Sequence, residues 1–277
     1  MIRDNSTLNT QHSTLLFIHG WATDSWVWEN QVKEFSKDYN VISIDLPGYD
    51  TTRVKGQKAC FLRSRVKDRG WFESTLTPAV EKVLRFTKSP LPPFSKVGDR
   101  GIIGIGWSLG ASVLMSAAVK YPELFKGLIL VGATPCFVKR DGFPWAQSKT
   151  LVKRMLKDLK NAPEETLSRF YPLNFTDEEL ADKEAQWFIK HYNPLAFSRE
   201  KHAFHPSALL SSLEALLNLD MRDDIKKIKA KTLVIHGDKD AVCPPGAGGY
   251  LAKNIKGASL EIFEDTGHAP FLTWEDG

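Results

Sequence analysis

The stretch GIIGIGWSLGAS, residues 101–112, decides the fold of this chain. Its apolar run Ile102–Ile105 is typical of a β-strand, breaks at Gly106, and is followed beyond Gly110 by apolar residues at helical spacing. The stretch therefore predicts a strand, a sharp turn and a helix. The glycines let the backbone turn tightly, so that the hydroxyl of Ser108 stands exposed at the edge of a sheet.

A Gly-x-Ser-x-Gly turn between a strand and a helix is typical of a nucleophile elbow. The pattern by itself is a weak signal, because it also occurs in glycine-rich turns that carry no chemistry. The apolar runs on both sides of it favour the elbow in this chain. The positive N-terminal end of the following helix would then face an anion formed at Ser108.

The composition is that of a soluble globular protein. The chain has 277 residues, of which 42% are hydrophobic and 25% charged, a length that α/β folds often reach as one domain. No apolar run approaches the roughly 18 residues that span a bilayer, and residues 1–13 lack the apolar core of a signal peptide. We therefore expect a cytoplasmic protein that does not bind membranes, and we expect it to be a monomer.

Cysteine spacing and charge argue against a metal site and against nucleic acid. Cys60, Cys136 and Cys243 lie far apart and form no Cys-x-x-Cys pair, so neither a disulfide framework nor a zinc site is indicated. The net charge of +4 is local, because residues 51–70 hold seven Lys or Arg against one acid. This distribution indicates one basic insertion and not a nucleic-acid-binding surface. We expect neither a metal nor an organic cofactor.

Apolar runs at six places predict the strands of an open, mostly parallel sheet. They lie at residues 14–18, 41–45, 102–105, 127–132, 232–236 and 260–263. Between the fourth and fifth runs, strand signals are absent and helical patterns follow one another at residues 151–159, 164–171, 177–190 and 206–217. Helices are also expected at residues 25–35 and 247–255. This alternation is that of the α/β-hydrolase fold.

The same pattern predicts how the chain is divided. A block of helices inserted between two strands of an α/β protein is a lid. We therefore expect an α/β core from residues 1–134 and 229–277 and a helical lid from residues 135–228. Within the core, residues 51–100 are basic and rich in proline, and they predict an exposed insertion with one helix at residues 74–86.

A serine hydroxyl needs a histidine to take its proton and a carboxylate to orient that histidine. In this fold the chain order is serine, acid, histidine. If the acid follows the strand at residues 232–236, His268 is the one histidine that comes after it. Asp238 and Asp240 are both candidates for the acid. We favour Asp240, because Asp238 follows the strand directly and suits the turn better.

The oxyanion of the tetrahedral intermediate needs two hydrogen-bond donors. The first is expected from the backbone N–H of Leu109, directly after the nucleophile, and the second from Trp21, in the loop after the first core strand. His19 is expected to pack that loop, and Asp45 to belong to a turn. For the rings of Trp21 and Trp107, core packing and an apolar wall for an acyl chain both remain open.

With these residues identified, the chain resembles the α/β-hydrolase superfamily and, within it, the BioH-type pimeloyl-acyl-carrier-protein methyl ester esterases of biotin synthesis. The general motifs are LFIHGW (16–21), DLPG (45–48), GWSLG (106–110) and GHAPF (267–271). The narrower motifs are PCF (135–137), TLSRF (166–170) and LEALLNLDMR (213–222). The resemblance implies the triad Ser108, Asp240 and His268, oxyanion donors at Trp21 and Leu109, and Phe170 near the substrate.

The resemblance also implies a reaction and a partner. Ser108 would attack the methyl ester of an acyl chain bound to acyl carrier protein and release methanol, after which water activated by His268 would free the carboxylate. The alternatives are a general carboxylesterase of short acyl esters and a non-catalytic binding protein of the same fold. Non-catalytic members usually lose a member of the triad, whereas all three residues are present here.

Charge at the expected lid fits an acidic carrier protein. Residues 139–169 hold eight Lys or Arg against four acids. Positive charge beside the entrance would speed the encounter with an acidic partner and orient it. Arg169 is the preferred single contact, because it belongs to the TLSRF motif and precedes Phe170. Lysines at helical spacing also form ordinary solvated helix faces, and this alternative remains open.

Overall fold

A computed structural model describes residues 14–49, 101–195 and 204–274 of the chain. Six strands form one sheet in the order β2-β1-β3-β4-β5-β6, and every neighbouring pair is parallel. The expected α/β fold with a parallel sheet is therefore confirmed. The basic insertion expected at residues 51–100, including its helix at 74–86, lies outside the described residues. The strands are β1 (Thr14–Ile18), β2 (Asn40–Ile44), β3 (Ile102–Trp107), β4 (Phe125–Val131), β5 (Lys231–Gly237) and β6 (Ser259–Phe263).

The central strand β3 carries two glycines because helix α3 (Leu109–Lys120) packs directly on it. A Cβ atom on Gly106 would lie 2.7 Å from the backbone nitrogen of Ala111, and one on Gly104 would lie 2.8 Å from Leu114 Cδ2. A side chain at Gly106 would meet the backbone of the helix, and one at Gly104 would displace the Leu114 side chain. The glycines thus fix how closely the helix approaches the strand that leads to Ser108.

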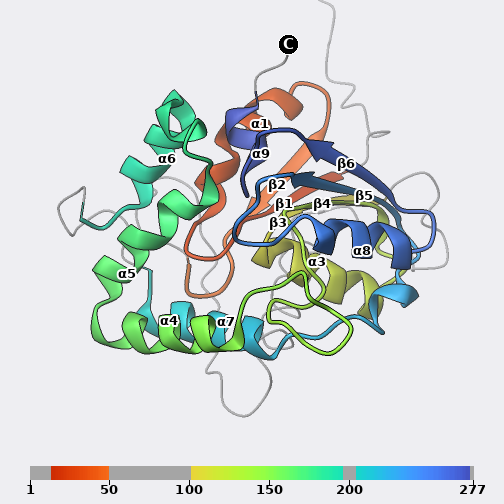
Figure 1. Ribbon diagram of the computed structural model, residues 1–277. Coiled ribbons are helices and arrows are strands. Elements are labelled where there is room, and N and C mark those ends of the chain that lie inside the picture. The colour runs from red at the N-terminus through yellow and green to blue at the C-terminus, as the bar shows by residue number, and fades with distance from the viewer. Residues whose placement is uncertain (1–13, 50–100, 196–203, 275–277) are drawn as a thin grey trace, which may run out of the picture.

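Helices cover both faces of the sheet (Figure 1). Helices α3 and α8 (Gly246–Asn254) lie on one face, and α1 (Glu29–Phe35) and the short α9 (Pro270–Thr273) lie together on the other. The second pair is joined by Trp28 and Phe271, whose rings stack with centroids 4.2 Å apart. The helix expected at residues 25–35 begins as a 3-10 turn, Ser25–Trp28, before α1.

The helices expected between the fourth and fifth strands are present and gather beside the sheet, at the left in Figure 1. The pattern at 177–190 was expected to form one helix and instead forms a 3-10 turn, η4, and the helix α6. The break has a local cause: Asp182 caps α6, and its carboxylate accepts hydrogen bonds from the backbone nitrogens of Glu184 and Ala185. The elements are α4 (Lys149–Asn161), α5 (Pro163–Phe170), η3 (Tyr171–Asn174), η4 (Glu179–Ala181), α6 (Lys183–Tyr192) and α7 (Pro206–Asn218).

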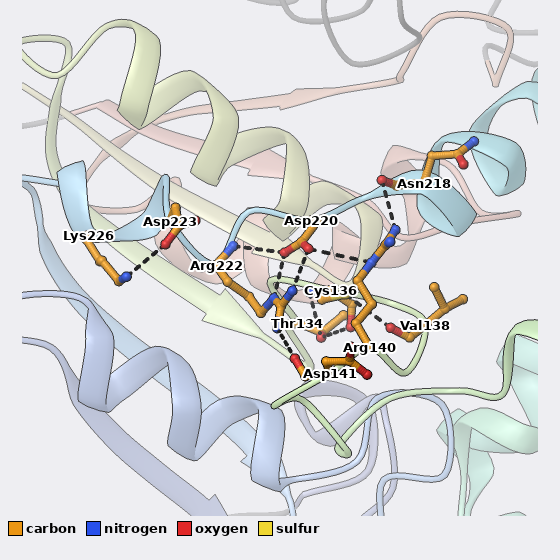
Figure 2. A network of polar contacts seen from close by, with 10 residues as sticks. All are labelled: Thr134, Cys136, Val138, Arg140, Asp141, Asn218, Asp220, Arg222, Asp223 and Lys226. Carbon is orange, nitrogen blue, oxygen red and sulfur yellow. Dashed lines mark hydrogen bonds and ion pairs between the residues drawn. The ribbon is translucent and has the colours of Figure 1, made fainter.

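The two segments that connect these helices to the sheet are bonded to each other, and we call this region the neck (residues 134–141 and 218–226; Figure 2). The Arg222 guanidinium donates two hydrogen bonds of 2.8 Å to the Asp220 carboxylate and one of 2.6 Å to the carbonyl of Asp141. Arg140 donates to the carbonyl of Asn218 at 3.3 Å. The hydrogen bonds from Arg222 hold the pKa of Asp220 below its usual range.

Candidate active site

Ser108 lies at the turn between β3 and α3, in a backbone conformation that residues other than glycine rarely adopt. Its φ is 53° and its ψ is −112°. Its backbone N–H donates to the carbonyl of Val131 at 2.9 Å, which ties the turn to the end of β4. Trp107 and Leu109, on either side, are buried, whereas Ser108 is partly exposed. The fold therefore strains the backbone at Ser108, the one residue from Gly106 to Gly110 that is not fully buried.

His268 is buried and is fixed through its ring and its backbone. Its ring nitrogen Nδ1 donates to Asp240 Oδ2 at 2.7 Å. Its carbonyl accepts a 2.8 Å hydrogen bond from the indole nitrogen of Trp107, the residue before Ser108. The loop that carries His268 is therefore bonded to the turn that carries Ser108.

Gly132 connects the serine turn to the His268 ring. It follows Val131, whose carbonyl accepts the hydrogen bond from Ser108, and its φ is +53°. A Cβ atom on Gly132 would lie 2.8 Å from Nδ1 and 2.9 Å from Cε1 of His268. The imidazole therefore rests on the bare backbone at the end of β4, one residue from the carbonyl that holds Ser108.

Asp240 is buried, and both of its carboxylate oxygens are occupied. Oδ1 accepts hydrogen bonds from the backbone nitrogens of Val242 at 2.9 Å and Cys243 at 2.7 Å, while Oδ2 faces His268. Burial alone would raise the pKa of Asp240, but the neighbouring imidazoles of His268 and His236 outweigh burial and hold this pKa well below its usual range. The carboxylate is therefore ionised at neutral pH.

Asp238, the second candidate for the acid, lies in a different setting. Its Oδ1 accepts from the backbone nitrogen of Thr266 at 3.3 Å, and its Oδ2 lies 3.5 Å from the ammonium group of Lys239. It thus spans the turn after β5, as the sequence suggested. Of the two aspartates, Asp240 is the one that the structure brings to His268.

His236 is a member of this cluster that the sequence did not single out. It is buried in β5, and its Nε2 lies 2.6 Å from the carbonyl of Cys243 and 3.2 Å from Asp240 Oδ2. Both neighbours of Nε2 are acceptors, so the ring proton belongs on that nitrogen. Asp240 Oδ2 therefore has an imidazole nitrogen on each side, that of His268 at 2.7 Å and that of His236 at 3.2 Å. The histidine precedes the acid in the chain, and the serine, acid, histidine order gave no reason to select it.

The loop after β1 carries Trp21, the expected second oxyanion donor. The Trp21 ring is buried, its indole nitrogen donates to the carbonyl of Leu209 at 3.1 Å, and its ring meets Phe170 edge to face with centroids 4.9 Å apart. Ala22, the next residue, has a φ of 57°. Leu109 begins α3, so its N–H is one of the first four of that helix, which have no carbonyl partner within the helix.

His19 and Trp107 are both buried residues that pack beside this site. His19 Nδ1 donates to the carbonyl of Gly20 at 2.8 Å, and Nε2 accepts from the backbone nitrogen of Leu46 at 2.9 Å. These two bonds fix its neutral tautomer and fit a packing role. The Trp107 ring is 1% exposed and lies against Gly20, which favours core packing over an exposed wall.

Phe170 and Arg169, the two candidates from the TLSRF motif, point to different surroundings. Phe170 packs on Trp21. The Arg169 side chain is 68% exposed and its guanidinium lies 4.0 Å from the Asp158 carboxylate at the end of α4. Phe170 is thus partly buried beside the loop after β1, and Arg169 lies on the outer face of α4 and α5.

The described part of the chain contains no group of three or more His, Cys, Asp or Glu side chains arranged to hold a metal ion. None of the helices in the described ranges is long and apolar enough to cross a membrane.

Known proteins resemble this chain over nearly its whole length. The sequence profile of the Alpha/beta hydrolase family matches residues 15–276. A pimeloyl-[acyl-carrier protein] methyl ester esterase of Nitrosomonas europaea is 28% identical over 262 residues, which cover 95% of this chain and 91% of that protein. A protein of the same name from Wigglesworthia glossinidia brevipalpis is 29% identical over 94% of this chain and 88% of its own length.

Solved structures agree with this relationship. An esterase from Exiguobacterium antarcticum, EaEST, superimposes with a TM-score of 0.74 at 25% identity and covers 95% of this chain and 87% of its own. A bromoperoxidase from Bacillus anthracis superimposes with a TM-score of 0.76 at 19% identity, over 95% of this chain and 87% of its own, which shows that the fold is shared.

Proposed function

Because this chain belongs to the Alpha/beta hydrolase family, we propose that it is a serine carboxylesterase with Ser108 as nucleophile, His268 as general base and Asp240 as the acid that orients the base. It is a hydrolase that acts on ester bonds, in agreement with the names of its relatives and of the similar solved structure. The observation that carries the proposed triad is the 2.7 Å hydrogen bond from His268 Nδ1 to Asp240 Oδ2, beside the strained turn at Ser108.

The proposed reaction has two half-reactions. His268 takes the proton of the Ser108 hydroxyl as the oxygen attacks the ester carbonyl, and the buried, ionised Asp240 stabilises the imidazolium that forms. The N–H groups of Leu109 and Trp21 stabilise the oxyanion. His268 then protonates the departing alcohol, which leaves an acyl-enzyme. Water activated by His268 hydrolyses the acyl-enzyme and releases the carboxylate.

The proposed substrate is the methyl ester of pimeloyl-acyl-carrier protein, an ester of biotin synthesis. The support is the name shared by relatives that are 28% and 29% identical over most of this chain. We propose further that residues 135–228 form a lid on a core built from residues 1–134 and 229–277. The carrier protein would dock on this lid.

The exposed face of α4 supports docking of an acidic carrier protein. Lys149, Lys153 and Lys157 are exposed along α4, and Arg169 of α5 adds a fourth cation beside its end. The opposite face of α4 is apolar and buried through Val152, Leu156 and Leu159. A cationic face of this kind would raise the rate of encounter with an acidic carrier.

The first experiment tests the triad. Wild-type protein should hydrolyse p-nitrophenyl butyrate and the methyl ester of pimeloyl-acyl-carrier protein, and the Ser108→Ala variant should hydrolyse neither above background. A Ser108→Ala variant that keeps a tenth of the wild-type turnover would exclude Ser108 as the nucleophile.

The second experiment tests the carrier protein. Arg169→Glu should lower kcat/KM for the carrier-bound methyl ester about ten-fold or more, with a smaller effect at high salt, and should leave p-nitrophenyl butyrate hydrolysis within about two-fold. Lys253→Glu, the same charge reversal on the exposed side of α8, is the control and should change neither reaction. Equal losses on both substrates would place Arg169 in the fold or the pocket.

A general carboxylesterase of short acyl esters is the second candidate. The similarity to EaEST, named only as an esterase, favours it. It predicts equal kcat/KM for the free methyl ester of pimelate and for the carrier-bound ester, whereas the first candidate predicts a clear preference for the carrier-bound form. Measuring both substrates with the same preparation separates the two.

A further inference from the structure

The loop that carries His268 is held by the inserted helices as well as by the core. We call residues 265–268 the histidine loop. Its last two backbone N–H groups both donate to acceptors between α5 and α6: Gly267 donates to Glu179 Oε2 at 2.8 Å, and His268 donates to the carbonyl of Asn174 at 2.8 Å. The position of His268, the candidate base, therefore depends in part on a segment outside the sheet.

The Glu179 carboxylate has a fixed orientation because it is bound from three sides. Oε2 accepts from Gly267 and also from the backbone nitrogen of Thr176, at 2.8 Å, within its own turn. Oε1 accepts from the hydroxyl of Thr273 in α9. The side chain thus joins its own turn, the histidine loop and α9, and it lies half-buried at their junction.

The contact between the two segments is made by backbone. A Cβ atom on Gly267 would lie 2.6 Å from the carbonyl oxygen of Asn174 and 2.9 Å from Cα of Phe175. At Gly267 the backbones of the two segments meet directly, which leaves little room for one to move without the other. A shift of residues 174–179 would therefore shift the histidine loop with it.

The same segment also reaches the loop after β1, residues 19–24, which carries Trp21 and which we call the oxyanion loop. The Tyr171 hydroxyl, fully buried, donates to the carbonyl of Ala22 at 2.8 Å, next to Trp21. The Asn174 side chain donates to the carbonyl of Tyr171 at 2.9 Å. This bond joins the residue that contacts His268 to the residue that contacts Ala22. We call residues 171–179 the brace, because it bonds to both the oxyanion loop and the histidine loop.

We propose that Glu179 is a positioning residue that holds His268 in register with Asp240, and that the brace is a fixed part of the catalytic site. This proposal rests on the proposed function, since it assigns His268 the role of base. Without the carboxylate, the N–H of Gly267 loses its acceptor in a buried place, and the histidine loop gains freedom to rotate. A displacement of about 1 Å at a reacting group costs on the order of 100-fold in rate.

The test compares three variants with p-nitrophenyl butyrate as substrate. Glu179→Leu fills the space and removes both acceptor oxygens, and its kcat should fall 10- to 100-fold while KM stays within about three-fold. Glu179→Gln keeps an oxygen for the two N–H donors and presents its amide to the Thr273 hydroxyl, so it should stay within about three-fold of the wild-type kcat. Glu178→Ala, one residue away and exposed, is the matched control and should equal the wild type.

Folding and catalysis are separated by measuring each variant's Tm and circular dichroism, and by assaying well below the Tm. Thr273→Val removes only one donor to Glu179 and provides a milder variant if Glu179→Leu does not fold; its kcat should fall about three-fold with KM unchanged. A kcat for folded Glu179→Leu within two-fold of the wild type would overturn the proposal, as would a loss confined to KM. So would a Glu179→Gln variant as impaired as Glu179→Leu, or a wild-type kcat for Thr273→Val where Glu179→Leu does not fold.

Failure of the proposed function gives a different result. If Ser108→Ala remains active, the triad is wrong whatever the Glu179 variants do. If Ser108→Ala is inactive and Glu179→Leu is fully active, the triad stands and the brace has no positioning role.

Discussion

Replacing Gly132 by alanine should disable the candidate site with little change elsewhere. The added methyl would lie 2.8 Å from His268 Nδ1, and ordinary contact begins at 3.4 Å, so the ring must move by about 0.6 Å or more. The ring cannot move freely, because Nδ1 is bonded to Asp240 and the His268 carbonyl, held by Trp107, would lie 3.0 Å from the same methyl. Since about 1 Å costs on the order of 100-fold, we expect kcat to fall roughly 10- to 100-fold.

The backbone effect of Gly132→Ala has to be separated from the contact with His268. The φ of +53° alone costs an alanine roughly 1–2 kcal/mol of stability. Gly257→Ala is the matched control, because Gly257 has a φ of +74° and nothing within 4 Å of its added methyl. In urea unfolding Gly257→Ala should lose only this backbone cost, whereas Gly132→Ala should lose more, because the contact with the buried His268 adds to it. Gly257→Ala should keep the wild-type kcat for p-nitrophenyl butyrate. A Gly132→Ala variant with more than half of the wild-type kcat would refute this reasoning.

Three further results are expected. Asp240→Asn should lower kcat by several orders of magnitude while Asp238→Asn leaves it largely intact, and the reverse ranking would move the acid to Asp238. His236→Leu should lower kcat about ten-fold, while His236→Gln, which keeps a donor near the position of Nε2, should be less impaired. Equal kcat values for the two variants would show that the second imidazole does not orient the carboxylate. Asp220→Asn should cost about 1 kcal/mol of stability at pH 6. Because the pKa of Asp220 is lowered in the folded state, this difference should shrink as the pH falls below 3.8. A stability difference that stays constant with pH in urea unfolding would contradict this expectation.

The fold and the elbow were predictable because they rest on local patterns. Apolar runs located the six strands of the described residues to within about two residues, and the run before Gly106 identified the turn at Ser108. The choice of Asp240 over Asp238 as the partner of His268 was also accessible, since it depended only on how far each residue lies from the end of β5.

Contacts between distant segments were not accessible from the sequence. Glu179 and Gly267 are 88 positions apart, and no spacing rule relates a glutamate in a short turn to a backbone N–H in a loop of the core. The break between η4 and α6 was missed for a similar reason, because the capping carboxylate of Asp182 overrode the helical pattern. His236 was passed over because chain order excludes it as the base, although the fold brings it to Asp240.

The inserted helices are anchored twice, and the two anchors differ in what they can control. At the neck, the side chains of Arg222 and Asp220 are 25% and 32% exposed, so water and salt screen their ion pair. The pair therefore affects the stability of the protein and has little effect on catalysis. At the brace, Glu179 and the Asn174 carbonyl accept from the buried backbone N–H groups of Gly267 and His268, and His268 itself carries the imidazole that pairs with Asp240. A displacement at the neck can relax through these partly exposed side chains, whereas a displacement at the brace passes directly to His268. Substitutions at the neck should therefore lower Tm and leave kcat unchanged, and Glu179→Leu should lower kcat even where Tm is preserved.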